Sequence, residues 1–156
     1  MTPAIKAAER AGIRFEILEY KHDAQVRAYG PEAARVLGLP PEAVFKTLVA
    51  KVDGRELVVA LVPVDKNLDL KALAAALDGK RAEMAEAAEA ERATGYVVGG
   101  ISPLGQRRRL PMVVDESALQ LEKIYVSAGR RGLEIGIRPA DLLSLCQATT
   151  AFLARS

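Results

Sequence analysis

The sequence predicts a small α/β domain of the α+β type, with a mixed, mostly antiparallel sheet and short flanking helices. Two apolar runs of strand length, 44–52 and 56–64, are separated by Asp53-Gly54, a strong signal for a tight hairpin turn. Helical segments that begin at proline and end at glycine lie around them. The chain has 156 residues and half of them are hydrophobic, so one domain over residues 1–156 is expected.

The first half of the chain alternates helical and extended segments. Thr2-Pro3 has the form of a helix cap followed by a first-turn proline, and Gly12 ends that helix. In the strand that follows, Phe15 and Ile17 are expected to face inward. The expected elements are helix 3–11, strand 14–20, polar loop 21–30, helix 31–38, strand 44–52 and strand 56–64. The last strand is almost wholly apolar, which indicates burial on both faces.

The second half continues the pattern with shorter elements. The expected elements are helix 69–77, strand 80–84, helix 86–92, strands 112–115, 123–127 and 133–137, helix 139–146 and an edge strand within 148–153. A second glycine-rich basic turn is expected at 128–132. Hairpins of this kind favour a mixed sheet over a doubly wound parallel one.

Composition excludes several classes of protein. The net charge is only +2, so contact with nucleic acid requires a local basic patch rather than a global field. No apolar run has membrane length, and the first residues lack the apolar core of a signal peptide. Cys146 is the single cysteine, so no internal disulfide is possible and a reducing cytoplasm is the expected location.

The most informative segment is 94–111, which places four glycines around a short apolar stretch expected to be a strand. Glycine lets the backbone approach a ligand closely, and free backbone N–H groups in such a loop bind anions or carbonyl oxygens. The glycines are Gly95, Gly99, Gly100 and Gly105, and three arginines, Arg107, Arg108 and Arg109, follow them. A glycine-lined pocket beside a basic patch suits a small reactive group carried on a long polyanion. Arg130 and Arg131 join that patch if the two turns are adjacent.

Candidate catalytic residues are few. His22 is the only histidine, and a solvated loop residue is the simpler interpretation of it than a member of a catalytic triad. Cys146 lies among leucines, so its expected role is that of a small buried hydrophobic residue and not of a nucleophile. With one residue of each kind a zinc site is disfavoured, and no metal or cofactor is expected.

Lys46 and Tyr20 carry two open interpretations each. Lys46 interrupts an apolar strand on the face of Val44, Leu48 and Ala50. It is either a strand-end lysine whose amine extends to water, or a cleft lysine that holds a phosphate or polarises a carbonyl. Tyr20 is either half-buried packing with a solvated hydroxyl, or a platform for a base or substrate amine.

At these residues the chain resembles the YbaK/EbsC family of aminoacyl-tRNA deacylases, and closely its Cys-tRNA(Pro) deacylase branch. The similarity runs in order over nearly the whole chain. Its motifs are Met1-Thr2-Pro3-Ala4, Tyr20 with His22-Asp23, Phe45-Lys46-Thr47-Leu48, Leu68-Asp69-Leu70-Lys71, Glu83-Met84-Ala85, the Thr94 to Gln106 run, Ile124-Tyr125-Val126-Ser127 and Arg131-Gly132-Leu133.

The resemblance implies the fold of the editing domain found in prolyl-tRNA synthetases, and removal of cysteine from Cys-tRNA(Pro) or also from Cys-tRNA(Cys). It implies that Lys46 is the key residue and binds the tRNA end. The other implied substrate-binding residues are Tyr20, Thr47, Gly99, Gly100, Ile101, Ser102, Ser127 and Gly129. The five arginines are expected to contact tRNA, and prolyl-tRNA synthetase is the expected partner in a transient complex. The oligomeric state stays open.

The family mechanism needs no enzymatic nucleophile, because the substrate's own cysteine thiol attacks its ester. Two other functions stay open: a deacylase for alanine or another small residue, and a non-catalytic module that binds tRNA or a synthetase. Ala128 and Glu134 depart from the family pattern, which has glycine and often aspartate there, so the amino-acid specificity and any pocket role of Glu134 stay open.

Overall fold

The computed structural model describes residues 1–26 and 29–156, and it confirms the mixed, mostly antiparallel α/β class. The helices are α1 Pro3–Ala11, α2 Tyr29–Leu37, α3 Leu70–Ala76, α4 Ala87–Thr94 and α5 Pro139–Cys146, with 3₁₀ turns at Pro41–Ala43 and Glu116–Gln120. The strands are β1 Phe15–Glu19, β2 Phe45–Val52, β3 Glu56–Pro63, β4 Asn67–Leu68, β5 Ala82–Met84, β6 Met112–Asp115, β7 Ile124–Arg130, β8 Leu133–Ile137, β9 Thr149–Ala151 and β10 Ala154–Arg155. Of the expected loop 21–30, residues 27–28 lie outside the described residues.

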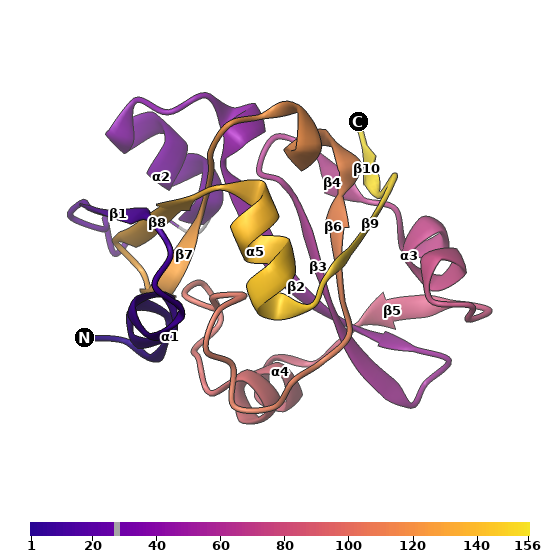
Figure 1. Ribbon diagram of the computed structural model, residues 1–156. Helices are drawn as coiled ribbons and strands as arrows, with labels where there is room; N and C mark the ends of the chain where they lie inside the picture. The colour runs from indigo at the N-terminus through magenta and orange to yellow at the C-terminus, as the bar shows by residue number, and fades with distance from the viewer. Residues whose placement is uncertain (27–28) are drawn as a thin grey trace.

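The described strands form three sheets rather than the one expected. The largest has the order β5-β2-β3-β6-β9, with parallel pairing at β3–β6 and β6–β9. A second, antiparallel sheet has the order β1-β8-β7, and β10 pairs with β4. Figure 1 shows α5 crossing in front of the five-stranded sheet, with α1 beside the β1-β8-β7 sheet.

The core lies on both sides of β3, as its apolar run predicts. Leu57, Val59 and Leu61 join one buried cluster, which also contains residues of α1, α4 and α5. The alternate residues Val58, Ala60 and Val62 join a second cluster with Leu73 of α3. Because successive side chains of a strand point to opposite faces, this strand is the wall between two cores.

Local signals in the sequence explain the ends of several elements. The hydroxyl of Thr2 accepts a hydrogen bond from the Ile5 N–H, and Gly12 ends α1 in the left-handed conformation. Asp53 and Gly54 have φ values of 53° and 69°, as the tight turn between β2 and β3 requires.

Two expectations about local structure are wrong, and a third holds only in part. Residues 96–98 form no strand, because the Val98 N–H binds the Glu91 carboxylate and the Gly100 N–H binds the Val97 carbonyl, which folds them into turns. β7 continues through the first part of the expected turn to Arg130, with a bulge between Ser127 and Arg130. Ile17 lies on the same face as its ladder partner Ile135, which is buried, as expected. It is nevertheless 39% exposed, because β1 is the edge strand of its sheet.

Candidate active site

One edge of β2 is open along half of its length. β3 pairs with β2 from Phe45 to Val52. Among the described residues, the other edge is paired only at its two ends, with β5 over Ala50–Val52 and with β7 through a parallel bridge between Val44 and Tyr125. Val49 accepts a hydrogen bond from the Ala85 N–H on that side. Since alternate residues of an antiparallel strand direct their peptide groups to the same edge, the N–H and C=O of Thr47 face the open edge.

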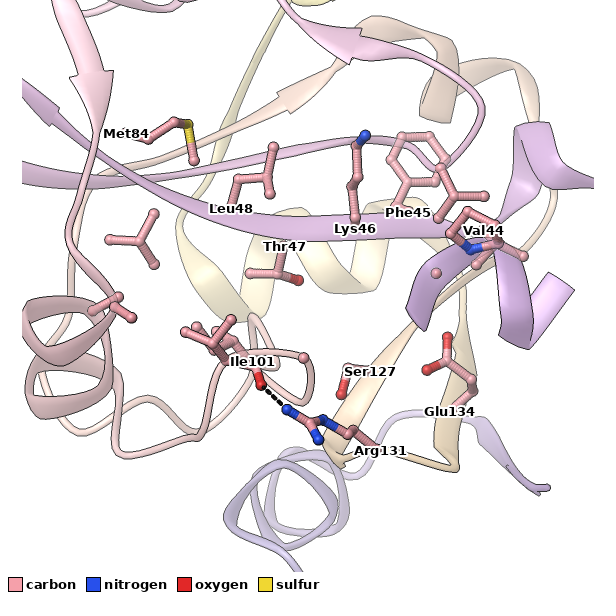
Figure 2. Close-up of a pocket in the computed structure, with 18 of the residues that line it drawn as sticks. Val44, Phe45, Lys46, Thr47, Leu48, Met84, Ile101, Ser127, Arg131 and Glu134 are labelled. Atoms are coloured by element: carbon pink, nitrogen blue, oxygen red, sulfur yellow. Dashed lines mark hydrogen bonds between the residues drawn. The ribbon is translucent and has the colours of Figure 1, made fainter. Parts of the chain in front are cut away.

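A cavity of about 520 Å³ lies along this open edge. It therefore receives side chains from both faces of β2, Lys46 and Leu48 from one and Thr47 and Val49 from the other. Figure 2 shows Lys46 and Thr47 projecting to opposite sides of the strand. The remaining lining residues are Tyr20, Gly30, Pro31, Val44, Phe45, Val64, Met84, Ala85, Ala87, Ala90, Val98, Gly99, Ile101, Ser127, Arg131 and Glu134.

Lys46 is a half-buried residue of the cavity and not a fully solvated strand-end lysine. Burial lowers the pKa of its amine, and the nearby Asp65 carboxylate acts against that shift. Lys46 pairs across the ladder with Val62, which places it on the predicted face of β2. A partly desolvated ammonium in a cleft is suited to hold an anionic group.

Two hydroxyl groups face the other side of the strand. The Thr47 Oγ1 atom is buried and makes no hydrogen bond to any described residue. Ser127 accepts a hydrogen bond from the Gly129 N–H, which leaves its own proton to donate. Both residues line the cavity, so they offer polar contacts to a ligand at the open edge.

Tyr20 is fixed in the cavity wall by its surroundings. Its N–H donates to the Gly132 carbonyl, and burial followed by the charge of Glu134 raises the pKa of its phenol to about 12. Two residues on, His22 is not a solvated loop histidine: its Nδ1 lies 2.6 Å from Glu32 Oε1 of α2. Glu32, 2% exposed, also accepts the Asp23 N–H. This His22–Glu32 clasp joins the segment after β1 to α2.

Glu134 of β8 is the residue that the sequence left unassigned. Its side chain is buried and lines the cavity, and burial raises the pKa of its carboxyl to about 8. Glu134 pairs across the ladder with Ser127, so both side chains share one face of the sheet. The alternation of Leu133, Ile135 and Ile137 predicts that Glu134 faces away from the core, so periodicity in the sequence carries no signal for its burial.

The structure brings together Tyr20, Lys46, Thr47, Gly99, Ile101 and Ser127, but not every predicted residue lines the cavity. Gly100, Ser102 and Gly129 are absent from the lining. A Cβ at Gly100 would lie 2.8 Å from Arg130 Cα, and one at Gly129 would lie 2.9 Å from the Tyr96 ring. The Ser102 hydroxyl accepts the Leu104 N–H. Local packing and hydrogen bonding therefore explain why a glycine or a serine stands at each of these three positions.

The arginines divide between two places. Arg131 lines the cavity and donates to the Val98 carbonyl at 3.0 Å (Figure 2). Arg130 lies 3.5 Å from Glu19 on the surface. Arg108 and Arg109 line a second, more polar cavity beside the β2–β3 turn. Arg107 is exposed, and its Nη1 lies 3.5 Å from the Arg92 carbonyl oxygen.

Over residues 1–26 and 29–156, no group of three or more His, Cys, Asp or Glu side chains is arranged to hold a metal ion. Cys146 is buried, and burial raises the pKa of its thiol to about 11, which leaves it unreactive at neutral pH. Among the described helices, none is long and apolar enough to cross a bilayer.

Comparison with known proteins matches the aminoacyl-tRNA editing domain to residues 24–145. EbsC of Enterococcus faecalis, named as a Cys-tRNA(Pro)/Cys-tRNA(Cys) deacylase, is 42% identical over 72% of this chain and 68% of its own length. The multifunctional Ser/Thr-tRNA deacylase ProXp-y of Escherichia coli is 33% identical over 65% of this chain and 64% of its own.

Related domains also occur inside longer enzymes. A proline–tRNA ligase of Acidithiobacillus ferrooxidans is 31% identical over 65% of this chain but only 18% of its own length. The fold matches a crystal structure described as a trans-editing enzyme for prolyl-tRNA synthetase, with TM-score 0.85 and 24% identity over 100% of this chain and 99% of that one. Because the family match covers most of the chain, the protein belongs to the aminoacyl-tRNA editing domain family and is an aminoacyl-tRNA deacylase.

Proposed function

We propose that this enzyme removes cysteine from mischarged Cys-tRNA(Pro), and also acts on Cys-tRNA(Cys). The observation that carries the proposal is the chemistry of the cavity: its described lining contains neither histidine nor cysteine, and its polar groups are hydroxyls, one lysine, one arginine and a buried acid. Such a set positions and stabilises a substrate but supplies no strong nucleophile. The 42% identity to a relative named for these two substrates supports the same assignment.

The substrate supplies the missing nucleophile. The cysteine thiol attacks the carbonyl of its own ester, the new C–S bond replaces the C–O bond to the terminal ribose, and the thiol proton passes to the departing oxygen. The products are free tRNA and a thiolactone. Lys46 holds the phosphate and ribose on one face of β2, while the Thr47 edge and Ser127 orient the ester on the other. Backbone groups at Gly99 and Ile101 complete the wall.

The proposal extends to partners and location. Tyr20 and the arginines contact the tRNA end, and prolyl-tRNA synthetase delivers tRNA(Pro) in a transient complex. The occurrence of related domains within proline–tRNA ligases supports that association. The enzyme then acts in the cytoplasm, on newly charged tRNA.

The test is to incubate the protein with Cys-tRNA(Pro), Ala-tRNA(Pro) and Ser-tRNA(Pro) and to follow loss of the amino acid. We expect rapid loss of cysteine with appearance of the thiolactone or its hydrolysis product, and slow loss of the other two. Loss of alanine alone would assign the enzyme to another branch of the family, and retention of all three would contradict catalysis.

A second candidate substrate is serine, because a relative with 33% identity is named as a Ser/Thr-tRNA deacylase. Serine matches cysteine in size but its hydroxyl is far less nucleophilic than a thiol. Release of serine as fast as cysteine in the same assay would favour this candidate over thiol-assisted cleavage.

A further inference from the structure

The two ends of the active-site cavity differ in chemistry. At the end formed by β1, β7 and β8 lie Tyr20, Ser127 and Glu134, whereas the end formed by β5 and α4 is lined by apolar residues such as Met84 and Ala90. In Figure 2 the Glu134 carboxyl points from β8 into the cavity beside Ser127, and Met84 lies at the far end. A substrate with one charged and one apolar group therefore enters in a single orientation.

Glu134 is held firmly where it stands. β8 is the middle strand of its sheet, and Glu134 lies between Leu18 of β1 and Ser127 of β7 in the ladder. The residue is only 7% exposed. Burial alone shifts its pKa, with no described cation or hydrogen-bond donor acting against it. A buried acid that no described residue pairs with costs free energy, so its presence in a binding cavity points to a ligand group that completes it.

The proposed substrate has one group of that kind close to the scissile bond. An aminoacyl ester carries an α-ammonium on the carbon next to its carbonyl, and its amino acid must enter the cavity for the ester to reach the open edge at Thr47. The apolar end offers an ammonium neither charge nor hydrogen bonds. On the opposite face of β2, where the phosphate is proposed to bind, the positive charge of Lys46 would repel an ammonium group.

Resting on the proposed function, we infer that Glu134 binds the α-ammonium group of the aminoacyl ester and so fixes the amino acid with its amine toward β8. A bound ammonium favours the ionised form of the carboxyl, so it lowers the pKa that burial has raised and pairs the two opposite charges. Glu134 is thus a specificity-determining residue that separates a free aminoacyl-tRNA from one whose amine is blocked.

The experiment compares Cys-tRNA(Pro) with N-acetyl-Cys-tRNA(Pro), which keeps the thiol but has lost the charge. We expect the wild-type enzyme to prefer the free amine by about 10-fold or more in kcat/KM, as one charged hydrogen bond provides. Glu134→Gln should bring that preference close to unity, chiefly by raising KM for the free amine. Glu134→Asp, which keeps the carboxyl, should retain the preference.

Glu83→Gln is the matched control, because Glu83 is an exposed glutamate of β5 outside the cavity lining. It should preserve the wild-type preference. Equal cleavage of both substrates by the wild-type enzyme, a comparison that needs no variant to fold, would overturn the inference and leave the proposed function standing. A preference that survives in Glu134→Gln would assign the amine to another residue. Release of cysteine from neither substrate would overturn the proposed function as well.

Discussion

Lys46 and Thr47 are adjacent in sequence yet serve opposite sides of the active site. Alternation along β2 directs Lys46 to one face and Thr47 to the other, and the open edge lets one cavity include both. Period-two spacing in the sequence predicts that the two side chains lie on opposite faces. The open edge depends instead on the end of β5 at Met84. Strand length and pairing determine that end, and neither leaves a local signal at Lys46.

Lys46→Ala should lower kcat/KM for Cys-tRNA(Pro) by about 100-fold or more, because it removes a positioned cation in a partly desolvated site. Stability should change little, since the lysine contributes little to either core. Steady-state deacylation and thermal unfolding measure the two effects. The control is Lys51→Ala on the same strand, whose amine pairs with Glu89 at 2.7 Å outside the cavity lining. Normal turnover by Lys46→Ala would remove Lys46 from the site.

Glu134 should make stability depend on pH. Its pKa rises from 4.5 to about 8 on folding, so between these values the folded protein holds a proton that the unfolded chain has released. Stability therefore falls as pH rises through this window. Glu134→Gln lacks the titrating group, so its melting temperature relative to wild type should increase from about pH 4.5 to about pH 8 and then level off. A difference that stays constant with pH would contradict the buried acid.

Among elements, α2 is tied to the cavity wall by the His22–Glu32 clasp. Burial raises the pKa of Glu32, but the hydrogen bonds from the Asp23 N–H and from His22 outweigh it and lower the pKa overall. A lowered carboxyl pKa stabilises the fold above the unfolded value and loses that effect as pH falls through the folded one. The clasp should therefore weaken in acid.

Glu32→Ala should destabilise the protein by about 1–3 kcal/mol at neutral pH, because it removes the acceptor of two partly buried hydrogen bonds, from His22 and from the Asp23 N–H. The difference from wild type should shrink below about pH 4.5, where the carboxyl of the unfolded chain is itself protonated. Urea unfolding at several pH values measures it. Glu42→Ala, at an exposed position of the 3₁₀ turn, provides the baseline. Equal effects of the two substitutions would show that the clasp contributes nothing.

Two glycines with nearly the same backbone offer a matched test of how α1 docks. Gly54 and Gly105 have φ values of 69° and 66°, so alanine is equally strained at both. A Cβ at Gly54 meets nothing within 4 Å, whereas one at Gly105 lies 2.5 Å from the Pro3 carbonyl oxygen at the start of α1. Gly105→Ala should be the more destabilising by about 1–3 kcal/mol in urea unfolding. Similar losses would mean that α1 moves freely on this loop.

The sequence predicts the elements better than it predicts their contacts. Thr2 with Gly12 and Asp53 with Gly54 act within a few residues, so their helix and hairpin follow from local chemistry. Residues 96–98 have the composition of a strand but fold as turns, because the distant Glu91 side chain takes the Val98 N–H. The partner of His22 and the burial of Glu134 likewise arise from tertiary packing, which spacing along the chain does not encode.

At the scale of the whole molecule, charge is distributed rather than concentrated. Arg131 lines the active-site cavity, while Arg108 and Arg109 line the second one. A long polyanion such as tRNA has the length to contact both. The net charge of +2 adds little general attraction, so binding depends on these local contacts.

Replacing residues 107–109 together with alanine should weaken tRNA binding and flatten its salt dependence. For each phosphate that the protein no longer neutralises, the slope of log K against log salt should fall by about 0.7–0.9. Filter binding or anisotropy over a salt series measures the slope. A variant with Lys6, Arg10 and Arg14 replaced removes the same charge from exposed positions in α1 and just before β1. Identical slopes for the two variants would show that residues 107–109 contribute no more to tRNA binding than other exposed basic residues.

The open edge of β2 has a consequence for inhibition. A strand edge recognises any extended backbone, since its N–H and C=O groups contact main chain and not side chain. Between the Val44–Tyr125 bridge and Val49, no strand of the described chain pairs with β2 on the cavity side. A short peptide that bound to this edge as an added strand would occupy the position proposed for the ester. It would then compete with charged tRNA, although it has no chemical likeness to a nucleotide.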